Sequence, residues 1–172
     1  MAYALFINRN DIIKNTPLQG AIDADALLPF CRTAQDKYLK NLLGTVLFEY
    51  LQAQIVAGTV SSLNAYYQAL LDDQIKNTLI WYACVEYIPF SSVQFKSNGA
   101  MKQQSEQGIA PTKGEIDYLL AKAQANADYY ALRLQNYLIS YSQFIPQYLQ
   151  SVGNQTQIYP DQSNQYFGGI QL

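Results

Sequence analysis

The chain has 172 residues, of which 49% are hydrophobic and only 14% charged, and its formal net charge is −2. This length suits one domain with a substantial core. No window is rich in lysine or arginine, which argues against binding nucleic acid through phosphate neutralisation. The fifteen tyrosines fit either a protein that hides its surface against other proteins or a tyrosine-rich core.

Compartment and cysteine state are also constrained by the sequence. No stretch approaches the roughly 18 apolar residues that span a bilayer, and the N-terminal YALFI run is too short and uncharged for a secretory signal. We therefore expect a soluble protein made in a reducing cytoplasm. Cys31 and Cys84 each lie on an apolar helical stripe without CxxC spacing, which predicts buried free thiols.

Residues 1–22 are predicted to form an N-terminal arm. The YALFI run is strand-like, and Pro17 and Gly20 indicate extended or turning backbone before the first helix. Because the arm combines apolar anchors with little charge, we expect it to be mobile in the isolated chain and to order on a partner. Phe6 and Ile7 are its predicted interface residues.

Two helices follow, separated by a glycine. Proline is tolerated only near a helix start, so the proline at position 29 places the first helix at about 29–43. Gly44 is predicted to end it, and a second helix of about 45–57 is predicted to end at Gly58. Leucines recur at helical spacing through AQDKYLKNLLGTVLFEYL, while the charged residues fall on a solvated face.

Apolar helical spacing resumes beyond a predicted cap at Ser61 or Ser62. Asp72 and Asp73 interrupt it, either as a kink or as the acidic first turn of a new helix. The segment NTLIWYACVEYI is apolar nearly all round, which predicts the most buried helix, with its tryptophan, Trp81, in the core. Near the end of this helix lies an acidic residue, Glu86, which is expected at the rim of the core rather than in an ion pair.

An insertion at about 91–111 separates this helix from the last one. SVQFKSNGAMKQQ alternates apolar and polar residues around Asn98-Gly99, which predicts a β-hairpin with positive φ in its turn. Asn98 and Gly99 are therefore predicted interface residues.

A long helix is predicted after this insertion. Thr112 and Glu115 form a capping box, and the helix should run about 30 residues towards Pro146. Its apolar positions recur in steps of four and three, as in a helix packed lengthwise on partners. These positions are Ile116, Leu120, Ala123, Ala127, Tyr130, Leu134, Tyr137, Tyr141 and Phe144.

Residues 146–172 are predicted to form a C-terminal tail. The segment is rich in Gln, Asn and Gly and cannot by itself bury enough apolar surface to offset the entropy of ordering. Tyr166 and Phe167 are its predicted anchors on a partner, and Gly168 and Gly169 let the backbone approach closely.

Residues suited to catalysis are few. The chain has no histidine, which removes histidine-activated nucleophiles and histidine-ligated zinc, and it has no glycine-rich phosphate loop. Three carboxylate pairs lie at predicted helix starts, where acidic residues stabilise the helix. The pairs are Asp23 with Asp25, Asp72 with Asp73, and Glu115 with Asp117. We predict no catalytic, cofactor-binding or metal site, and a protein that is not an enzyme.

These elements predict an all-α fold: a helical bundle of about four to five helices with one long C-terminal helix, a short β-hairpin insertion and extended N- and C-terminal arms. The helical domain would span residues 23–145, between an arm at 1–22 and a tail at 146–172.

Several stretches, taken in order, resemble the small head–tail connector (neck-ring or adaptor) proteins of tailed bacteriophages. The resemblance is nearest to those of phages of gut Bacteroidetes, including the crAss-like phages. It is carried by LFINRNDIIKNTPLQGAIDAD, AQDKYLKNLLGTVLFEYL, FKSNGAMKQQSE, ANADYYALRLQNYL and the YFGGIQL end. It covers nearly the whole chain, although each motif alone is a common packing or turn pattern.

The resemblance implies a virion protein at the head–tail junction, assembled in the bacterial host cytoplasm. Such subunits form a homo-oligomeric ring, typically of about twelve copies, below the portal protein. The ring extends the DNA channel, conducts DNA without sequence-specific binding and docks further neck or tail proteins. Two alternatives remain: a tail-completion or tail-terminator ring protein, and a monomeric helical adaptor that binds one protein partner.

Overall fold

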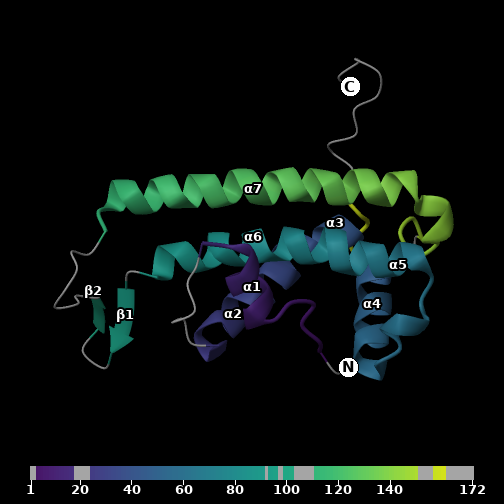
Figure 1. Cartoon of the computed structure of the whole chain (residues 1–172), viewed down its shortest axis with the longest axis horizontal. Coiled ribbons are helices and arrows are strands. Elements are labelled where there is room, and N and C mark those ends of the chain that lie inside the picture. The colour runs from purple at the N-terminus through teal and green to yellow at the C-terminus, as the bar shows by residue number, and fades with distance from the viewer. Residues whose placement is uncertain are drawn as a thin grey trace, which may run out of the picture.

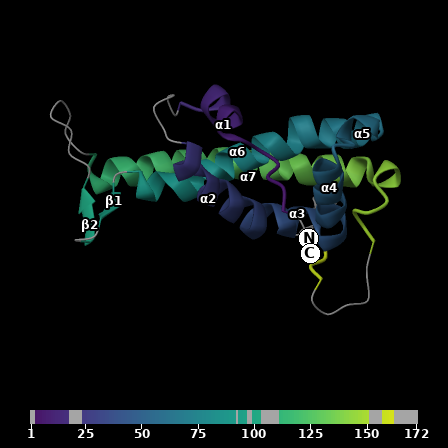
Figure 2. The ribbon, with the colours of Figure 1, turned by 90° about the horizontal axis from the view of Figure 1, so that it is seen from below.

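The computed structural model describes residues 3–17, 24–91, 93–96, 99–102, 111–150 and 157–161. Over these residues the fold is all-α, with one short pair of strands. The long helix α7 (Lys113–Ser140) lies lengthwise over α6 (Lys76–Tyr87). Helices α1 (Arg9–Asn15), α2 (Ala24–Ala34) and α4 (Thr45–Ala57) lie on the side of α6 away from α7, and α3 (Lys40–Leu43) also contacts α7 (Figures 1 and 2).

The first long helix starts earlier than the sequence predicts. α2 (Ala24–Ala34), a π-helical turn (Gln35–Leu39) and α3 (Lys40–Leu43) run on without a break, and Pro29 lies inside α2. The prediction that the helix begins at Pro29 is therefore wrong. Proline removes one backbone hydrogen bond, but it lies in the second turn, and burial of Leu27 and Cys31 on the inner face holds the helix in place.

Both predicted glycine boundaries are confirmed. Gly44 has φ +74° and ψ 160°, between α3 and α4 (Thr45–Ala57), and Gly58 ends α4 in the left-handed conformation with φ +68°. The N–H of Gly58 donates to the carbonyl oxygens of the last turn. Residues with a side chain seldom adopt either backbone conformation, so the chain turns at these two glycines.

A second long helix contains the most buried segment. α5 (Ala65–Ala69), a π-helical turn (Leu70–Ile75) and α6 are continuous, so Asp72 and Asp73 interrupt a helix and do not start one. The helix is capped by Asn64, not by the predicted serines, because the Asn64 side chain accepts the N–H groups of the first turn. Trp81 is only half-buried, although its neighbours in α6 are mostly core residues.

Two short strands lie where the sequence predicts a hairpin. β1 (Val93–Lys96) pairs antiparallel with β2 (Gly99–Lys102), and Lys96 lies opposite Gly99. The predicted turn includes Asn98, which lies outside the described residues.

The capping box that starts α7 is confirmed. The Glu115 N–H donates to the Thr112 hydroxyl at 3.3 Å, and the Thr112 N–H donates to the Glu115 carboxylate at 2.7 Å. The Thr112 hydroxyl also donates to this carboxylate at 2.8 Å, and the bonds from the Thr112 N–H and hydroxyl lower the pKa of Glu115.

The predicted length of the long helix, about 30 residues, is confirmed, but the helix ends before Pro146, and its predicted seam is correct only in the middle. α7 has 28 residues, about 42 Å, and ends at Ser140. Leu134 and Ala127 are fully buried and Leu120 and Tyr137 half-buried. The two aromatic residues beyond the helix end, Tyr141 and Phe144, are exposed, since the chain turns there and the seam does not continue.

The N-terminal arm packs on the core of its own chain, so its predicted mobility is wrong for residues 3–16. α1 (Arg9–Asn15) contacts α2 and α6 and buries Ile12 completely, while Phe6 and Ile7 retain 7% and 2% of their exposure. Burial of three large apolar side chains offsets the ordering of this segment.

The described part of the C-terminal tail also packs on the chain. Tyr148 is buried beyond α7, and Pro160 is buried in the segment 157–161. The prediction that this region orders only on a partner is wrong for these residues. The predicted buried free thiols are confirmed, and burial raises the pKa of Cys31 to about 11 and that of Cys84 to about 12.

Candidate functional site

Two buried glutamines hold the N-terminal segment in place. Gln35 donates to the Ala4 carbonyl oxygen at 2.9 Å and accepts the Phe6 N–H at 3.1 Å. Gln52 donates to the same carbonyl oxygen at 2.8 Å and accepts the Ala4 N–H at 3.0 Å. The two side-chain amides therefore pair with the extended backbone much as a neighbouring strand would.

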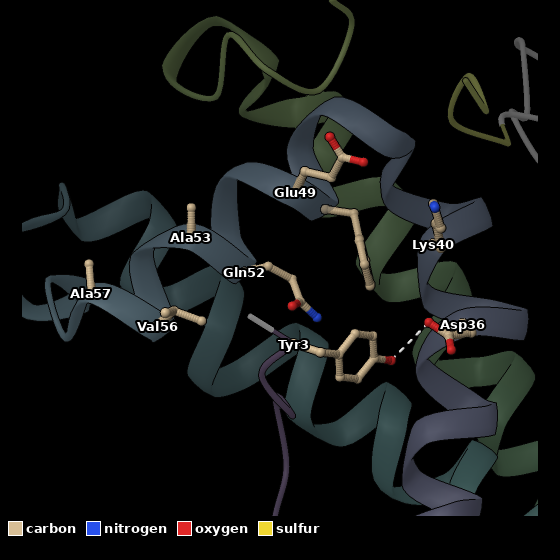
Figure 3. Close-up of a pocket in the computed structure, with 9 residues that line it drawn as sticks. Tyr3, Asp36, Lys40, Glu49, Gln52, Ala53, Val56 and Ala57 are labelled. Atoms are coloured by element: carbon tan, nitrogen blue, oxygen red, sulfur yellow. Dashed lines mark hydrogen bonds between the residues drawn. The ribbon is translucent and has the colours of Figure 1, made fainter. Parts of the chain in front are cut away.

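The same segment forms one wall of an apolar groove, which we call the Tyr3 groove. Its volume is about 450 Å³, and it opens between the N-terminal segment, the π-helical turn with α3, and α4 (Figure 3). It is lined by Tyr3, Asp36, Lys40, Phe48, Glu49, Gln52, Ala53, Val56 and Ala57. Apolar atoms make up most of its surface, so the groove suits apolar side chains with polar groups at its rim.

Tyr3 is fixed at the mouth of this groove. Its hydroxyl donates to the Asp36 carboxylate at 2.8 Å (Figure 3). The Arg32 guanidinium lies 4.7 Å from the centre of its ring. Partial burial and the Asp36 carboxylate raise the pKa of Tyr3, so the hydroxyl remains a hydrogen-bond donor. Val56, on the opposite side, is 51% exposed.

A second cluster holds the C-terminal segment 157–161 against the α3–α4 junction, and we call it the C-terminal latch. The Thr45 N–H donates to the Ile158 carbonyl oxygen at 2.9 Å, and the Ile158 N–H donates to the Thr45 hydroxyl oxygen at 2.9 Å. The Asp161 N–H donates to the Asn41 carbonyl oxygen at 2.9 Å. Pro160 lies over Gly44, where an added Cβ would come within 2.6 Å of its ring.

Glu86 is paired, so the expectation of an unpaired residue at the rim is wrong. Its carboxylate accepts hydrogen bonds from Lys37 at 2.8 Å and from the Tyr38 hydroxyl at 2.6 Å. Although partial burial opposes ionisation, these two bonds lower the pKa of Glu86. The Tyr38 ring stacks on Tyr82 at 4.0 Å, so the cluster fastens the first long helix to α6.

Of the predicted interface residues, two are placed inside the molecule. Phe6 and Ile7 lie in the core, where Phe6 packs against Phe48 at 5.7 Å, so neither presents an exposed contact surface. Gly99 is the first residue of β2. Asn98, Tyr166 and Phe167 lie outside the described residues.

Two of the acidic residues considered for catalysis have structural partners. Asp72 pairs with Lys76 at 2.6 Å, and Glu115 caps α7. The side chains of Asp23 and Asp25 lie outside the described part. Within the described residues there is no group of three or more His, Cys, Asp or Glu that could hold a metal ion.

The residues that build the Tyr3 groove were missed at the sequence level. Gln35 and Gln52 sit at buried positions of helical stripes, four residues after Cys31 and Phe48, respectively. A polar amide at such a position must find a partner, and this is the signal that could have pointed to a docked backbone.

The fold is all-α, with an apolar groove and with exposed apolar residues on its surface. Residues 39–158 match the family described as "Family of unknown function (DUF6712)", and the chain belongs to this family. The matched residues run from the π-helical turn to the latch. No curated protein and no solved structure matches the chain. None of the described helices combines the length and hydropathy needed to cross a membrane.

Proposed function

We propose that this protein is a structural, non-enzymatic subunit of a bacteriophage head–tail connector. In this proposal about twelve copies form a ring below the portal, extend the DNA channel and dock further neck or tail proteins. The subunit acts in the virion, without a cofactor, and DNA passes the ring without sequence-specific contacts.

The observation that carries the proposal is the Tyr3 groove. Subunits of a ring contact each other head to tail, so each needs two different surfaces, one of which receives the neighbour. The groove is apolar, lies on rigid helices and has Val56 and Tyr3 exposed at 51% and 41%. Low overall charge and the order of the motifs that resemble connectors support the same assignment.

The test is co-expression with the portal protein from the same genome, followed by native mass spectrometry. We expect a complex of about twelve copies bound to the portal. Val56→Lys, in the groove, should abolish ring formation, whereas Leu149→Lys, at a site that is similarly exposed at 45% and outside the groove, should not. A monomer that does not bind the portal would overturn the proposal in favour of an adaptor. A ring that binds tail tubes and not the portal would overturn it in favour of a terminator.

A further inference from the structure

The outer face of α7 carries an apolar stripe on which no described element packs. Tyr118 is 62% exposed, Tyr129 58%, Leu132 40% and Ile139 36%, although all four lie in regular helix. The core side of α7 is lined by small residues and leucines, and Figure 1 shows the remainder of the helical body on that side only. An apolar stripe of this length on a free helix face marks a contact surface.

The stripe contains a sequence repeat. DYLLAK at 117–122 recurs as DYYALR at 128–133, a shift of 11 residues, or three helical turns. In both copies the basic residue lies over the tyrosine ring, with Lys122 5.7 Å from the Tyr118 centroid and Arg133 6.0 Å from that of Tyr129. The two copies therefore present the same arrangement on the same face, about 16 Å apart.

The repeat also separates charge across the stripe. Asp117 and Asp128 lie on one flank, and Lys122 and Arg133, each five residues later, lie on the other, about 140° around the helix. Gln124, on the acidic flank, donates to Asp128 at 2.8 Å and leaves its charge in place. Asp128 also accepts a hydrogen bond of 3.5 Å from the Tyr82 hydroxyl. Between Asp117 and Arg133 one flank is thus acidic and the other basic, with the tyrosines and Leu132 between them; Glu115, at the start of the basic flank, is bonded to Thr112 as the helix cap.

This pattern is complementary to itself in one orientation. When two such helices pack in parallel, the acidic flank of one lies beside the basic flank of the other. An acidic residue at position i of one helix then lies beside position i+5 of the second helix. Asp117 then faces Lys122 of the second copy, and Asp128 faces Arg133, on both sides of the seam. An antiparallel pair would place acid beside acid and base beside base.

We propose that the outer face of α7 binds the same face of α7 in a second copy of this chain. The two helices run parallel and are related by a two-fold axis that lies between them and parallel to both. The seam would contain Tyr118, Ala121, Ala125, Tyr129, Leu132, Asn136 and Ile139. Steps of three and four residues set by an 11-residue repeat match nearly straight helices, as α7 is in Figure 1. This inference goes beyond the connector proposal, because a two-fold contact closes on itself and uses a different surface from the groove.

The charge pairing is tested by sedimentation velocity across a concentration series of the full chain. The wild type should show dimers, and Arg133→Glu should raise the dissociation constant about tenfold or more. The matched control, Lys14→Glu, makes the same charge change at an exposed site outside α7 and should leave the dimer intact. Mixing K122E/R133E with D117K/D128K should restore a dimer that neither variant forms alone.

The orientation is tested by cysteine cross-linking. Tyr118→Cys should oxidise to a covalent dimer, since identical positions meet in a parallel pair, while Ser62→Cys, exposed elsewhere, should not. A wild type that is monomeric at all concentrations would overturn the proposal, and so would a dimer insensitive to Arg133→Glu or one that Tyr118→Cys fails to link. Since Val56 lies outside this face, Val56→Lys should not affect the dimer, which separates this test from that of the ring.

Discussion

The two terminal segments are held on the helical body in different ways. The N-terminal segment inserts Phe6 and Ile7 into the core and has its backbone bound by two buried glutamine amides. The C-terminal latch lies on the surface, with Ile158 and Tyr159 41% and 53% exposed, and is held by backbone hydrogen bonds and by the contact of Pro160 with Gly44.

The N-terminal segment is therefore part of the folded core, whereas the C-terminal latch can detach while the core stays folded. Buried apolar area contributes to the free energy of unfolding, whereas a few partly buried hydrogen bonds contribute less net stability. Release of the latch would free the α3–α4 junction at a modest cost, but release of the N-terminal segment would open the core and remove one wall of the Tyr3 groove. The predictions that follow probe this contrast, from the largest expected effect to the smallest.

The largest effect is expected from Phe6→Ala. Removing a buried ring that packs against Phe48 should lower the free energy of unfolding by about 3–5 kcal/mol, measured by urea denaturation. Ile158→Ala, in the latch, should cost less than about 1 kcal/mol because that side chain is exposed. Equal losses for the two variants would mean that the segments are equivalent.

The second effect comes from Gly44→Ala, with Gly58→Ala as its matched control. Both glycines have positive φ, so both changes carry backbone strain of about 1–3 kcal/mol. Only at Gly44 would the new Cβ meet Pro160, whereas nothing lies within 4 Å at Gly58. The latch should therefore be displaced in Gly44→Ala alone, which faster hydrogen exchange of the Thr45 and Ile158 amides would show. Unchanged exchange would place the latch elsewhere in solution.

The sequence predicted the elements whose signals are local. Gly44, Gly58 and the Thr112–Glu115 box mark helix ends through backbone conformation and capping, which depend on a few neighbouring residues. The packing of Leu134 follows from helical periodicity alone.

The docking of both ends could not be predicted in the same way. Gln52 binds Ala4 across 48 residues and Thr45 binds Ile158 across 113, and no local pattern encodes such distances. A short apolar run followed by turn residues has the same sequence pattern whether it covers its own core or a partner. The sequence therefore predicts an arm that orders on a partner, although the arm packs on its own core. For Glu86, the two groups that pair with it, Lys37 and Tyr38, come from another helix.

The third effect distinguishes the glutamines that bind each end. Gln35→Leu leaves the buried Phe6 N–H without its acceptor and should cost about 1–3 kcal/mol. Gln135→Leu removes one bond to the Asp161 carbonyl oxygen, but the Gln135 Oε1 has no hydrogen-bond partner within the described residues. The loss at Gln135 should therefore stay within about 1 kcal/mol. Thermal unfolding of the two variants compares them directly, and a larger loss at Gln135 would reverse the contrast.

The smallest effect is a pH dependence that should be independent of both ends. Hydrogen bonds from Lys37 and Tyr38 lower the folded-state pKa of Glu86, so the unfolded chain binds this proton more readily than the folded one. Its stabilisation is therefore present at pH values above the ordinary glutamate pKa and is lost as the pH falls through the lower, folded-state value. Because Lys37 is exposed, solvent screens the pair and keeps the effect small.

Glu86→Gln should remove this contribution, so unfolding curves measured between about pH 5 and pH 3 should show a smaller loss of stability in the variant than in the wild type. The cluster joins the first long helix to α6, and none of the hydrogen bonds that the Glu86 carboxylate accepts within the described part of the chain comes from a terminal segment. The wild type and Glu86→Gln differ in how strongly their stability depends on pH. This difference should be the same in a Gly44→Ala background, where the latch is displaced, because independent sites contribute additively. A pH difference that changed when the latch was displaced would show that the latch and this helix pair are coupled, and the contrast between a core segment and an independent surface segment would then fail.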